Sequence, residues 1–298
     1  MQLFRDAIRQ ISVGASEDFD GVRITPVYIQ EAEPLTGYRD FDTLFDEGLV
    51  EASEVSDSGV VGRIAVLNRS QWSLCLFDGE ALVGAKQNRI VERSLIISPH
   101  AEVSVPVNCV ERGRWSGIGG RGHFEKSDFA ATPSMRMTKA QMMKEGRIGA
   151  IQSEVWACVD QVAACHDVRS SSDDLGEIYE RAGQSDTGAI TDYIDYSVCH
   201  GFIVEGLRRP FLEIFCDTEF CQRYAKKAVK GWMSERAGSA FSKSPLDAGK
   251  CLSRLKTCTW REDETYGSEK SWIPDDKNNG RLIQSREGHL VHMFLDLG

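Results

Sequence analysis

Charged and amide side chains gather at the two ends of the segment 78–115, and apolar, β-rich sequence lies between them. The first group contains Glu80, Lys86, Gln87, Asn88 and Arg89, and the second contains Asn108, Cys109, Glu111, Arg114 and Trp115. Burying charge is costly unless the charges are paired. A cluster of both signs can neutralise itself, and it can also bind a polar ligand. The segment is therefore the first candidate for a functional site.

Two stretches inside this segment, 89–98 and 102–110, have the alternation expected of strands, and residues 99–101 resemble the loop of a hairpin. An antiparallel pair with this tip places residue 89 roughly opposite residue 111. The two polar groups then form one neighbourhood. Its predicted members are Glu80, Lys86, Gln87, Arg89, Glu111 and Arg114.

Paired carboxylates can divide general acid and general base roles when their surroundings separate their pKa values. Glu80 and Glu111 are therefore the candidate catalytic residues. Trp115 can offer a stacking face to a base or a sugar, and Gln152 can point toward the cluster if its helix covers the sheet. A structural ion-pair network at the end of a sheet, with Trp115 packed against it, fits the same spacing equally well.

The composition limits the class of protein. The chain has 298 residues, of which 41% are hydrophobic and 27% are charged, which suffices for one large or two small cores. A net charge of −10 disfavours a general nucleic-acid binder, because phosphate neutralisation dominates such binding. No apolar stretch approaches a membrane span, and the N-terminus lacks the apolar region of a secretory signal. We expect a soluble cytoplasmic protein that binds neither membrane nor nucleic acid, and the oligomeric state stays open.

The nine cysteines are expected to be small buried residues in a reducing compartment. Their odd number and the lack of any CxxC spacing argue against a disulfide framework. A zinc site would need a tighter grouping of cysteine and histidine. We therefore predict no metal site and no cofactor.

The order of predicted elements indicates a single α+β domain over residues 1–298, because strands come first and helices with two hairpins follow. The β-rich part covers about residues 14–115 and is mostly antiparallel. A Gly-rich loop is expected at about 112–134, and the helical and hairpin part covers about 135–298.

A long helix is predicted over residues 137–168, with Thr138 as its N-cap and Gln141 completing a capping box. The other predicted helices cover 2–10, 171–183, 190–198 and 217–237, and the predicted C-terminal hairpins lie at 201–216 and around residues 287–288. The stretch 117–122, GIGGRG, fits a dinucleotide-binding fingerprint by letter, but no strand–helix context surrounds it. It is either a flexible loop that closes over an anionic ligand or a solvated loop.

The motifs GEALVGAKQNRI (79–90) and VPVNCVERGRW (105–115) resemble the ADP-ribosylglycohydrolase- and rhodanese-phosphatase-associated protein domain family. The stretches ITPVYI, IQSEVW (151–156) and GFIVEGLRRPFLEIFCDTEF extend the resemblance over roughly the whole chain. The Gly-rich insert after Trp115 and the segment 259–280 do not map onto the family pattern. The residues that match its two central motifs are Glu80, Lys86, Gln87, Arg89, Glu111, Gly113, Arg114 and Trp115.

The resemblance implies a role around NAD-derived or ADP-ribosyl compounds, and it favours a ligand site over a structural network. Glu80 and Glu111 would then act as acid and base or hold ribose hydroxyls. Phosphate groups would meet Lys86, Arg89 and Arg114, while Trp115 would stack on the base or ribose. We expect binding, with or without hydrolysis, of an ADP-ribose or NAD-derived nucleotide. The alternatives are a non-catalytic nucleotide sensor or sponge and a structural interaction protein.

Overall fold

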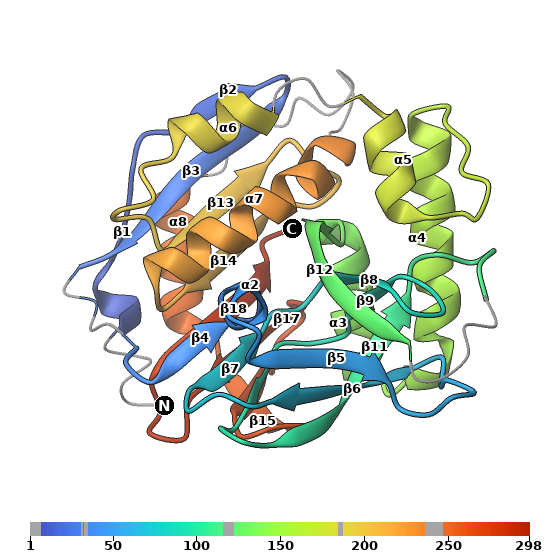
Figure 1. Ribbon diagram of the computed structural model, residues 1–298. Helices are drawn as coiled ribbons and strands as arrows, with labels where there is room; N and C mark the ends of the chain where they lie inside the picture. The colour runs from blue at the N-terminus through green and yellow to red at the C-terminus, as the bar shows by residue number, and fades with distance from the viewer. Residues whose placement is uncertain (1–6, 31, 33–34, 116–121, 184–186, 236–246) are drawn as a thin grey trace.

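The computed structural model describes residues 7–30, 32, 35–115, 122–183, 187–235 and 247–298. In this part of the chain the protein has an α+β fold, in which the strands form a nine-stranded sheet, a three-stranded sheet and a closed six-stranded barrel (Figure 1). The predicted fold class is thus confirmed. Of the helix expected over 2–10, residues 7–9 are helical and the others lie outside the described residues.

The nine-stranded sheet joins N-terminal strands to C-terminal ones. In spatial order its strands are β1 (Ile11–Val13), β3 (Val22–Ile29), β13 (Gly201–Glu205), β14 (Phe211–Phe215), β18 (Leu290–Asp296), β17 (Gly280–Gln284), β16 (Lys270–Pro274) and β15 (Trp260–Asp263), with β2 (Glu17–Phe19) paired to β3. Both predicted C-terminal hairpins are present, as β13–β14 and β17–β18. The turn of the second contains Gly288, whose φ of 99° lies in the left-handed region that glycine adopts without strain.

Two helices, α7 (Thr218–Ser234) and α8 (Ala248–Thr257), cover opposite faces of this sheet. Side chains alternate between the faces of a strand, so Phe202 and Val204 pack in the cluster that contains α7, whereas Ile203 packs in the cluster that contains α8. Figure 1 shows α7 lying across β13 and β14, with α6 (Thr187–Tyr193) over β3.

The barrel is closed by pairing between strands that are distant in the sequence. Its strands, in order around the ring, are β11 (Glu102–Cys109), β6 (Arg63–Asn68), β5 (Val50–Glu54), β12 (His123–Ala130), β8 (Glu80–Gly84) and β9 (Arg89–Val91). The three-stranded sheet beside it contains β10 (Leu95–Ile97), β7 (Ser73–Leu76) and β4 (Tyr38–Asp40), of which β4 and β7 are parallel. The apolar cluster that fills the barrel includes Ala52, Leu82, Val91, Val107 and Phe124.

The predicted hairpin of 89–98 and 102–110 is wrong in its pairing. Residues 89–98 are divided into β9 and β10, and β10 pairs with β7 in the other sheet. The strand β11 pairs first with β6 and then with β9, and it places Cys109, rather than residue 111, opposite Arg89. Barrel closure causes the difference, because it brings β6 to the side where β10 was expected.

The expected Gly-rich loop at 112–134 is also shorter than predicted. The strand β12 begins at His123, and the helix α3 (Pro133–Lys144) begins at Pro133. Of the stretch 117–122, only Gly122 lies within the described residues, so both alternatives for this stretch, a loop that closes over an anionic ligand and a solvated loop, lie outside them.

The long helix predicted over 137–168 is interrupted. It consists of α3, a short 3-10 helix η1 (Ile148–Ala150) and α4 (Ile151–Cys165). Gly146 follows α3 with a φ of 73°, a conformation that ends helices. The N-cap is Thr132, whose hydroxyl accepts a hydrogen bond from Met135 N at 3.3 Å, so the capping role expected of Thr138 is wrong.

The other helices beside the barrel are α2 (Phe41–Asp46) and α5 (Leu175–Arg181). No helix among the described residues is both long and apolar enough to cross a membrane.

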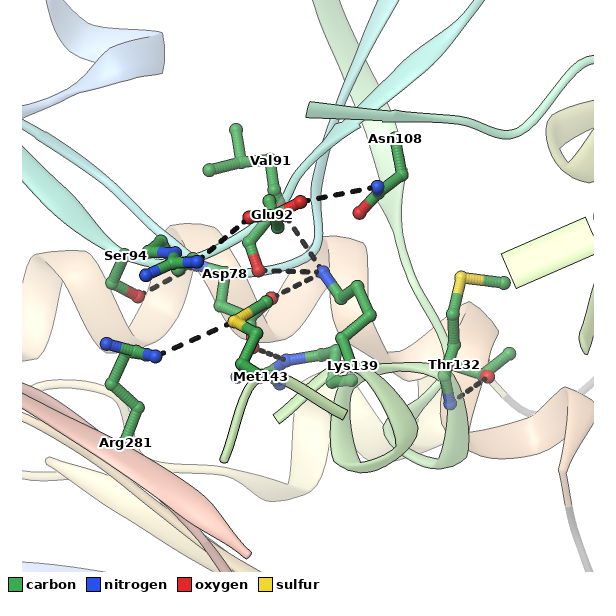
Figure 2. A network of polar contacts seen from close by, with 12 residues as sticks. Asp78, Val91, Glu92, Ser94, Asn108, Thr132, Lys139, Met143 and Arg281 are labelled. Atoms are coloured by element: carbon green, nitrogen blue, oxygen red, sulfur yellow. Dashed lines mark hydrogen bonds and ion pairs between the residues drawn. The ribbon is translucent and has the colours of Figure 1, made fainter. Parts of the chain in front are cut away.

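A buried charge network joins the barrel to the nine-stranded sheet. Asp78, in the turn before β8, accepts a hydrogen bond from Lys139 Nζ at 2.7 Å. The same ammonium donates to the backbone oxygens of Val91 and Glu92 at 3.0 and 3.1 Å, as Figure 2 shows. All three hydrogens of the ammonium therefore have acceptors, which compensates for its burial on α3.

Arg136, one turn before Lys139 on α3, extends the network into the sheet. Its guanidinium donates to both carboxylate oxygens of Glu213 on β14, at 2.6 and 3.1 Å, and to Asp78 at 3.4 Å. The guanidinium carbon also lies 3.9 Å from the centre of the Phe294 ring. Planar arginine–carboxylate pairs of this kind are strong and directional. Arg136 therefore fixes the turn before β8 relative to β14.

His292 completes the network on β18. Its Nε2 lies 2.9 Å from Glu213 Oε1, and its Nδ1 lies 2.9 Å from Ser94 Oγ. Burial lowers the pKa of His292, against the opposing effect of the Glu213 carboxylate. Burial alone would raise the pKa of Glu213, but the charge of Arg136 and the hydrogen bond from His292 lower it.

We expect Arg136→Met to lower the free energy of unfolding by about 3–5 kcal/mol, because it leaves Glu213 and Asp78 buried without their shared partner. Urea unfolding followed by circular dichroism measures this change. The control is Arg23→Met, which removes a surface ion pair with Asp18 and should change the free energy by about 1 kcal/mol or less. Equal losses in the two variants would contradict the role given to Arg136.

We also expect stability to fall as the pH drops below about 6.5, the ordinary value for histidine. Because the pKa of His292 is lowered in the fold, the unfolded chain binds a proton that the folded protein does not. One such proton changes the free energy of unfolding by at most about 1.4 kcal/mol per pH unit. Urea unfolding between pH 7.5 and 5.5 should show a shallower slope for His292→Gln than for the unaltered protein. Parallel profiles would contradict this assignment, since His200, whose pKa burial also lowers, is present in both proteins.

Candidate functional site

One end of the barrel carries charged side chains inside it. Arg89 lies two residues before Val91 on β9, Cys109 lies two after Val107 on β11, and Glu54 ends β5. Since side chains alternate along a strand, all three share the inward face of their strands. Glu54, Arg89 and Cys109 are 0% exposed. We call this end the barrel mouth.

The buried guanidinium of Arg89 lacks hydrogen-bond acceptors for part of its donor atoms. Nη1 donates to Gln87 Oε1 at 3.0 Å and to Cys109 Sγ at 2.8 Å, and Nη2 lies 3.7 Å from Glu54 Oε1. Among the described residues, Arg89 Nε, Arg89 Nη2 and Glu54 Oε2 have no hydrogen-bond partner. Buried polar atoms without partners are exceptions in folded proteins, and each one calls for a physical explanation.

Lys86 and Trp115 form the rim of the barrel mouth. Lys86 Nζ and the guanidinium carbon of Arg89 each lie 5.8 Å from the centre of the Trp115 ring. These distances are within the range of cation–π attraction. The Trp115 side chain nevertheless stays 46% exposed, although tryptophan is usually well buried. The barrel mouth therefore combines two cations, Lys86 and Arg89, with a large aromatic ring that solvent can reach.

Glu111 and Arg114 brace the turn that carries Lys86 and Gln87. Arg114 donates to Glu111 through Nε and Nη2, both at 2.7 Å, and to the backbone oxygens of Ala85 and Gly84 at 2.9 and 3.2 Å. Glu111 Oε2 also accepts from the backbone of Asn88 at 3.0 Å. The hydrogen bond with Glu111 raises the pKa of Arg114. Both oxygens of Glu111 are thus occupied in holding the turn.

Gln152 reaches the barrel mouth from the side, as expected if α4 covers the barrel. Its amide accepts from the backbone nitrogen of Cys109 at 2.8 Å and donates to the backbone oxygen of Cys109 at 2.9 Å. It therefore takes the place of a neighbouring strand at the end of β11. Gln87 Nε2 donates to the backbone oxygen of Arg112 at 3.2 Å, which ties the two polar segments together.

Glu80 lies apart from this group, so the expected single neighbourhood is wrong for this residue. It begins β8 opposite Ala130, whereas Leu82 on the same strand is opposite Arg89. β8 runs about 13 Å from Glu80 to Gly84, in four residue steps, so Glu80 lies at the end of this strand that is away from the barrel mouth. Residues at the start and at the end of a barrel strand lie at opposite ends of the barrel.

At that end Glu80 has a complete set of partners. Its Oε1 lies 2.9 Å from Lys227 Nζ on α7, and its Oε2 accepts from the backbone of Phe77 at 3.0 Å. Lys227 also donates to Asp42 at 2.7 Å. Burial raises the pKa of Glu80, Lys227 opposes this shift and Asp42 adds to it. The acid/base roles of Glu80 and Glu111 stay predictions.

Glu54 is a site residue that the sequence reasoning missed. It lies outside both polar groups, and its only local signal is the alternation of VEASE, which gives it the same face as Val50 and Ala52. Cys109 was expected to be a buried thiol. It is buried, and burial raises its pKa, while Arg89 opposes that shift. Its contact with Arg89 places it in the barrel mouth as well.

The similarity to a known family extends over nearly the whole chain and is not limited to the barrel mouth. Residues 10–295 match the model of the ARG and Rhodanese-Phosphatase-superfamily-associated Protein domain. No curated protein and no solved structure gives a significant match. The matched range contains every residue of the barrel mouth. The chain therefore belongs to the ARG and Rhodanese-Phosphatase-superfamily-associated Protein domain family.

Proposed function

We propose that the protein binds an anionic nucleotide of the ADP-ribose or NAD-derived class at the barrel mouth. One observation carries this proposal: Arg89 is fully buried, yet its Nε and Nη2 have no hydrogen-bond partner among the described residues. The oxygens of a phosphate group would supply acceptors to both atoms. Arginine suits this role, because its donors match phosphate geometry and it stays charged when buried.

The rest of the barrel mouth supports a nucleotide rather than free phosphate. Lys86 adds a second positive charge beside Arg89, and the exposed Trp115 ring can stack on a base. The mouths of β-barrels are common places for ligand sites. The family name supports the ADP-ribose class, because it links this family to ARG, the ADP-ribosylglycohydrolases.

Within this proposal, Lys86, Gln87, Arg89 and Trp115 face the ligand, while Glu111, Arg114 and Gln152 hold the backbone in place. Binding without reaction corresponds to a nucleotide sensor or sponge. Hydrolysis is the second version, and the free oxygen Oε2 of Glu54 favours it, because a carboxylate can act as a base toward water. In that version Glu54 would be the base at the barrel mouth, and the acid and base roles predicted for Glu80 and Glu111 are a separate expectation, because the oxygens of both residues already have partners.

We expect isothermal titration calorimetry to detect binding of ADP-ribose, and Arg89→Met and Lys86→Met each to weaken it at least about tenfold, because each loses a charge-assisted contact. The control, Lys126→Met, removes a cation paired with Asp46 on the barrel surface and should leave binding unchanged. If ADP-ribose, NAD and AMP all fail to bind, the proposal is wrong and a structural interaction protein is favoured. Mass spectrometry of the heat-denatured mixtures separates intact ligand, the result for a sponge, from hydrolysis products.

We expect Arg89→Met to destabilise the protein less than Arg136→Met does. The two losses of unfolding free energy should differ by at least about 2 kcal/mol. Both arginines are buried, but Arg136 has full partners, and Arg89 leaves two donors unpaired. Arg89→Met leaves one carboxylate, Glu54, which lies 3.7 Å from Arg89 Nη2 and accepts no hydrogen bond from it, whereas Arg136→Met leaves two carboxylates that lose direct hydrogen bonds. Urea unfolding of the two variants makes the comparison, and similar losses would mean that Arg89 serves stability instead of a ligand.

A further inference from the structure

The barrel mouth contains both hydrogen-bond donors and a hydrogen-bond acceptor that have no partner among the described residues. Arg89 leaves two donor atoms without partners, whereas Glu54 leaves one acceptor, Oε2. The other oxygen, Oε1, lies 3.4 Å from the backbone nitrogen of Lys86 and 3.7 Å from Arg89 Nη2. A phosphate group can satisfy the arginine, but it offers no hydrogen to Glu54 and would be repelled by it. A complementary ligand must therefore carry a hydrogen-bond donor close to its anionic group.

Gly59 lies close to Glu54 Oε2 and brings no hydrogen-bond donor to it. Gly59, in the loop between β5 and β6, has a φ of 73°, and a Cβ added there would lie 3.2 Å from Oε2 and 2.9 Å from Cδ of Lys86. Any larger residue would be strained and would crowd the space over the carboxylate. The loop thus approaches Lys86 and Glu54 closely, and Oε2 stays buried without a hydrogen-bond donor among the described residues.

Depth in the site indicates which part of a nucleotide reaches Glu54. Trp115 is 46% exposed and lies on the rim, while Glu54 is 0% exposed and lies inside the barrel. With the base on Trp115 and the phosphates on Lys86 and Arg89, the group beyond the phosphates meets Glu54. In ADP-ribose that group is the terminal ribose, whose hydroxyls are hydrogen-bond donors.

We propose that Glu54 accepts a hydrogen bond from a hydroxyl of the terminal ribose and so selects nucleotides that have a free sugar beyond their phosphates. This inference rests on the proposed function. A site that uses a buried acceptor in this way discriminates strongly against ligands that lack the hydroxyl, because the acceptor is then left unpaired. The simpler alternative is that Glu54 only balances the charge of Arg89.

The test measures the affinities of the unaltered protein and of Glu54→Gln for ADP-ribose, for its 2″-deoxy and 3″-deoxy analogues and for ADP. We expect the unaltered protein to bind at least one deoxy analogue about tenfold more weakly than ADP-ribose. In Glu54→Gln, ADP-ribose should lose a similar factor, and the same deoxy analogue should then bind no more weakly than ADP-ribose.

The matched control is Glu51→Gln on the same strand, where Glu51 pairs with Arg69 at the surface, and it should bind all four ligands like the unaltered protein. Urea unfolding checks that Glu54→Gln is folded. If Glu54→Gln does not fold, Glu54→Asp replaces it in the same measurements. The affinities of the unaltered protein for the deoxy analogues test the role of the ribose hydroxyl without any variant.

Equal affinity of the unaltered protein for ADP-ribose and both deoxy analogues would overturn the inference. So would an equal loss for all four ligands in Glu54→Gln, the result expected of a simple counter-ion. In either case the proposed function would survive, because ADP-ribose still binds. If the unaltered protein binds neither ADP-ribose nor ADP, the proposed function fails and the inference fails with it.

Discussion

The pairing of Arg136 with Glu213 and Asp78 is the interaction on which the rest of the structure depends. One helix, α3, carries both Arg136 and Lys139, three residues apart and therefore on one face. Through them the turn before β8 is held against the nine-stranded sheet, and the backbone after β9 is held by the ammonium of Lys139. Each of these charges is buried, so the arrangement is stable only when all of its partners are in place.

This network lies near the start of β8, and the barrel mouth lies near its end. One end of the barrel is thereby docked on the sheet through complete ion pairs, with Glu80 and Lys227 adding to them. The other end faces away from that docking contact and is shaped by the turn at residues 85–88, the loop after β5 and the segment that ends at Trp115. Glu111, Arg114 and Gln152 stiffen these backbone segments without filling the mouth.

Arg89 and Arg136 illustrate the difference between a buried charge with a full set of partners and one with donors left over. Both are almost completely buried. Arg136 donates to two carboxylates, while Arg89 contacts an amide oxygen and a thiol and leaves two nitrogens without partners. Buried charge of the second kind weakens a fold, and proteins keep such residues where binding or chemistry requires them.

The sequence by itself determined much of the local structure. Alternation and glycine positions predicted β3, the β13–β14 and β17–β18 hairpins and the helix α7, because these features depend on residues that are close along the chain. The motifs at 79–90 and 105–115 also identified the family, and they contain Lys86, Gln87, Arg89 and Trp115, which the structure brings to one end of the barrel.

Only the tertiary structure decided which polar residues share a site. Barrel closure pairs strands from distant parts of the chain, and it shifted the partner of Arg89 by two residues, from 111 to 109. A shift of two keeps every side chain on the same face, so the apolar pattern cannot reveal it. The same closure placed Glu80 near the far end and brought Glu54 into the mouth. These positions depend on long-range strand pairing, which local periodicity does not encode.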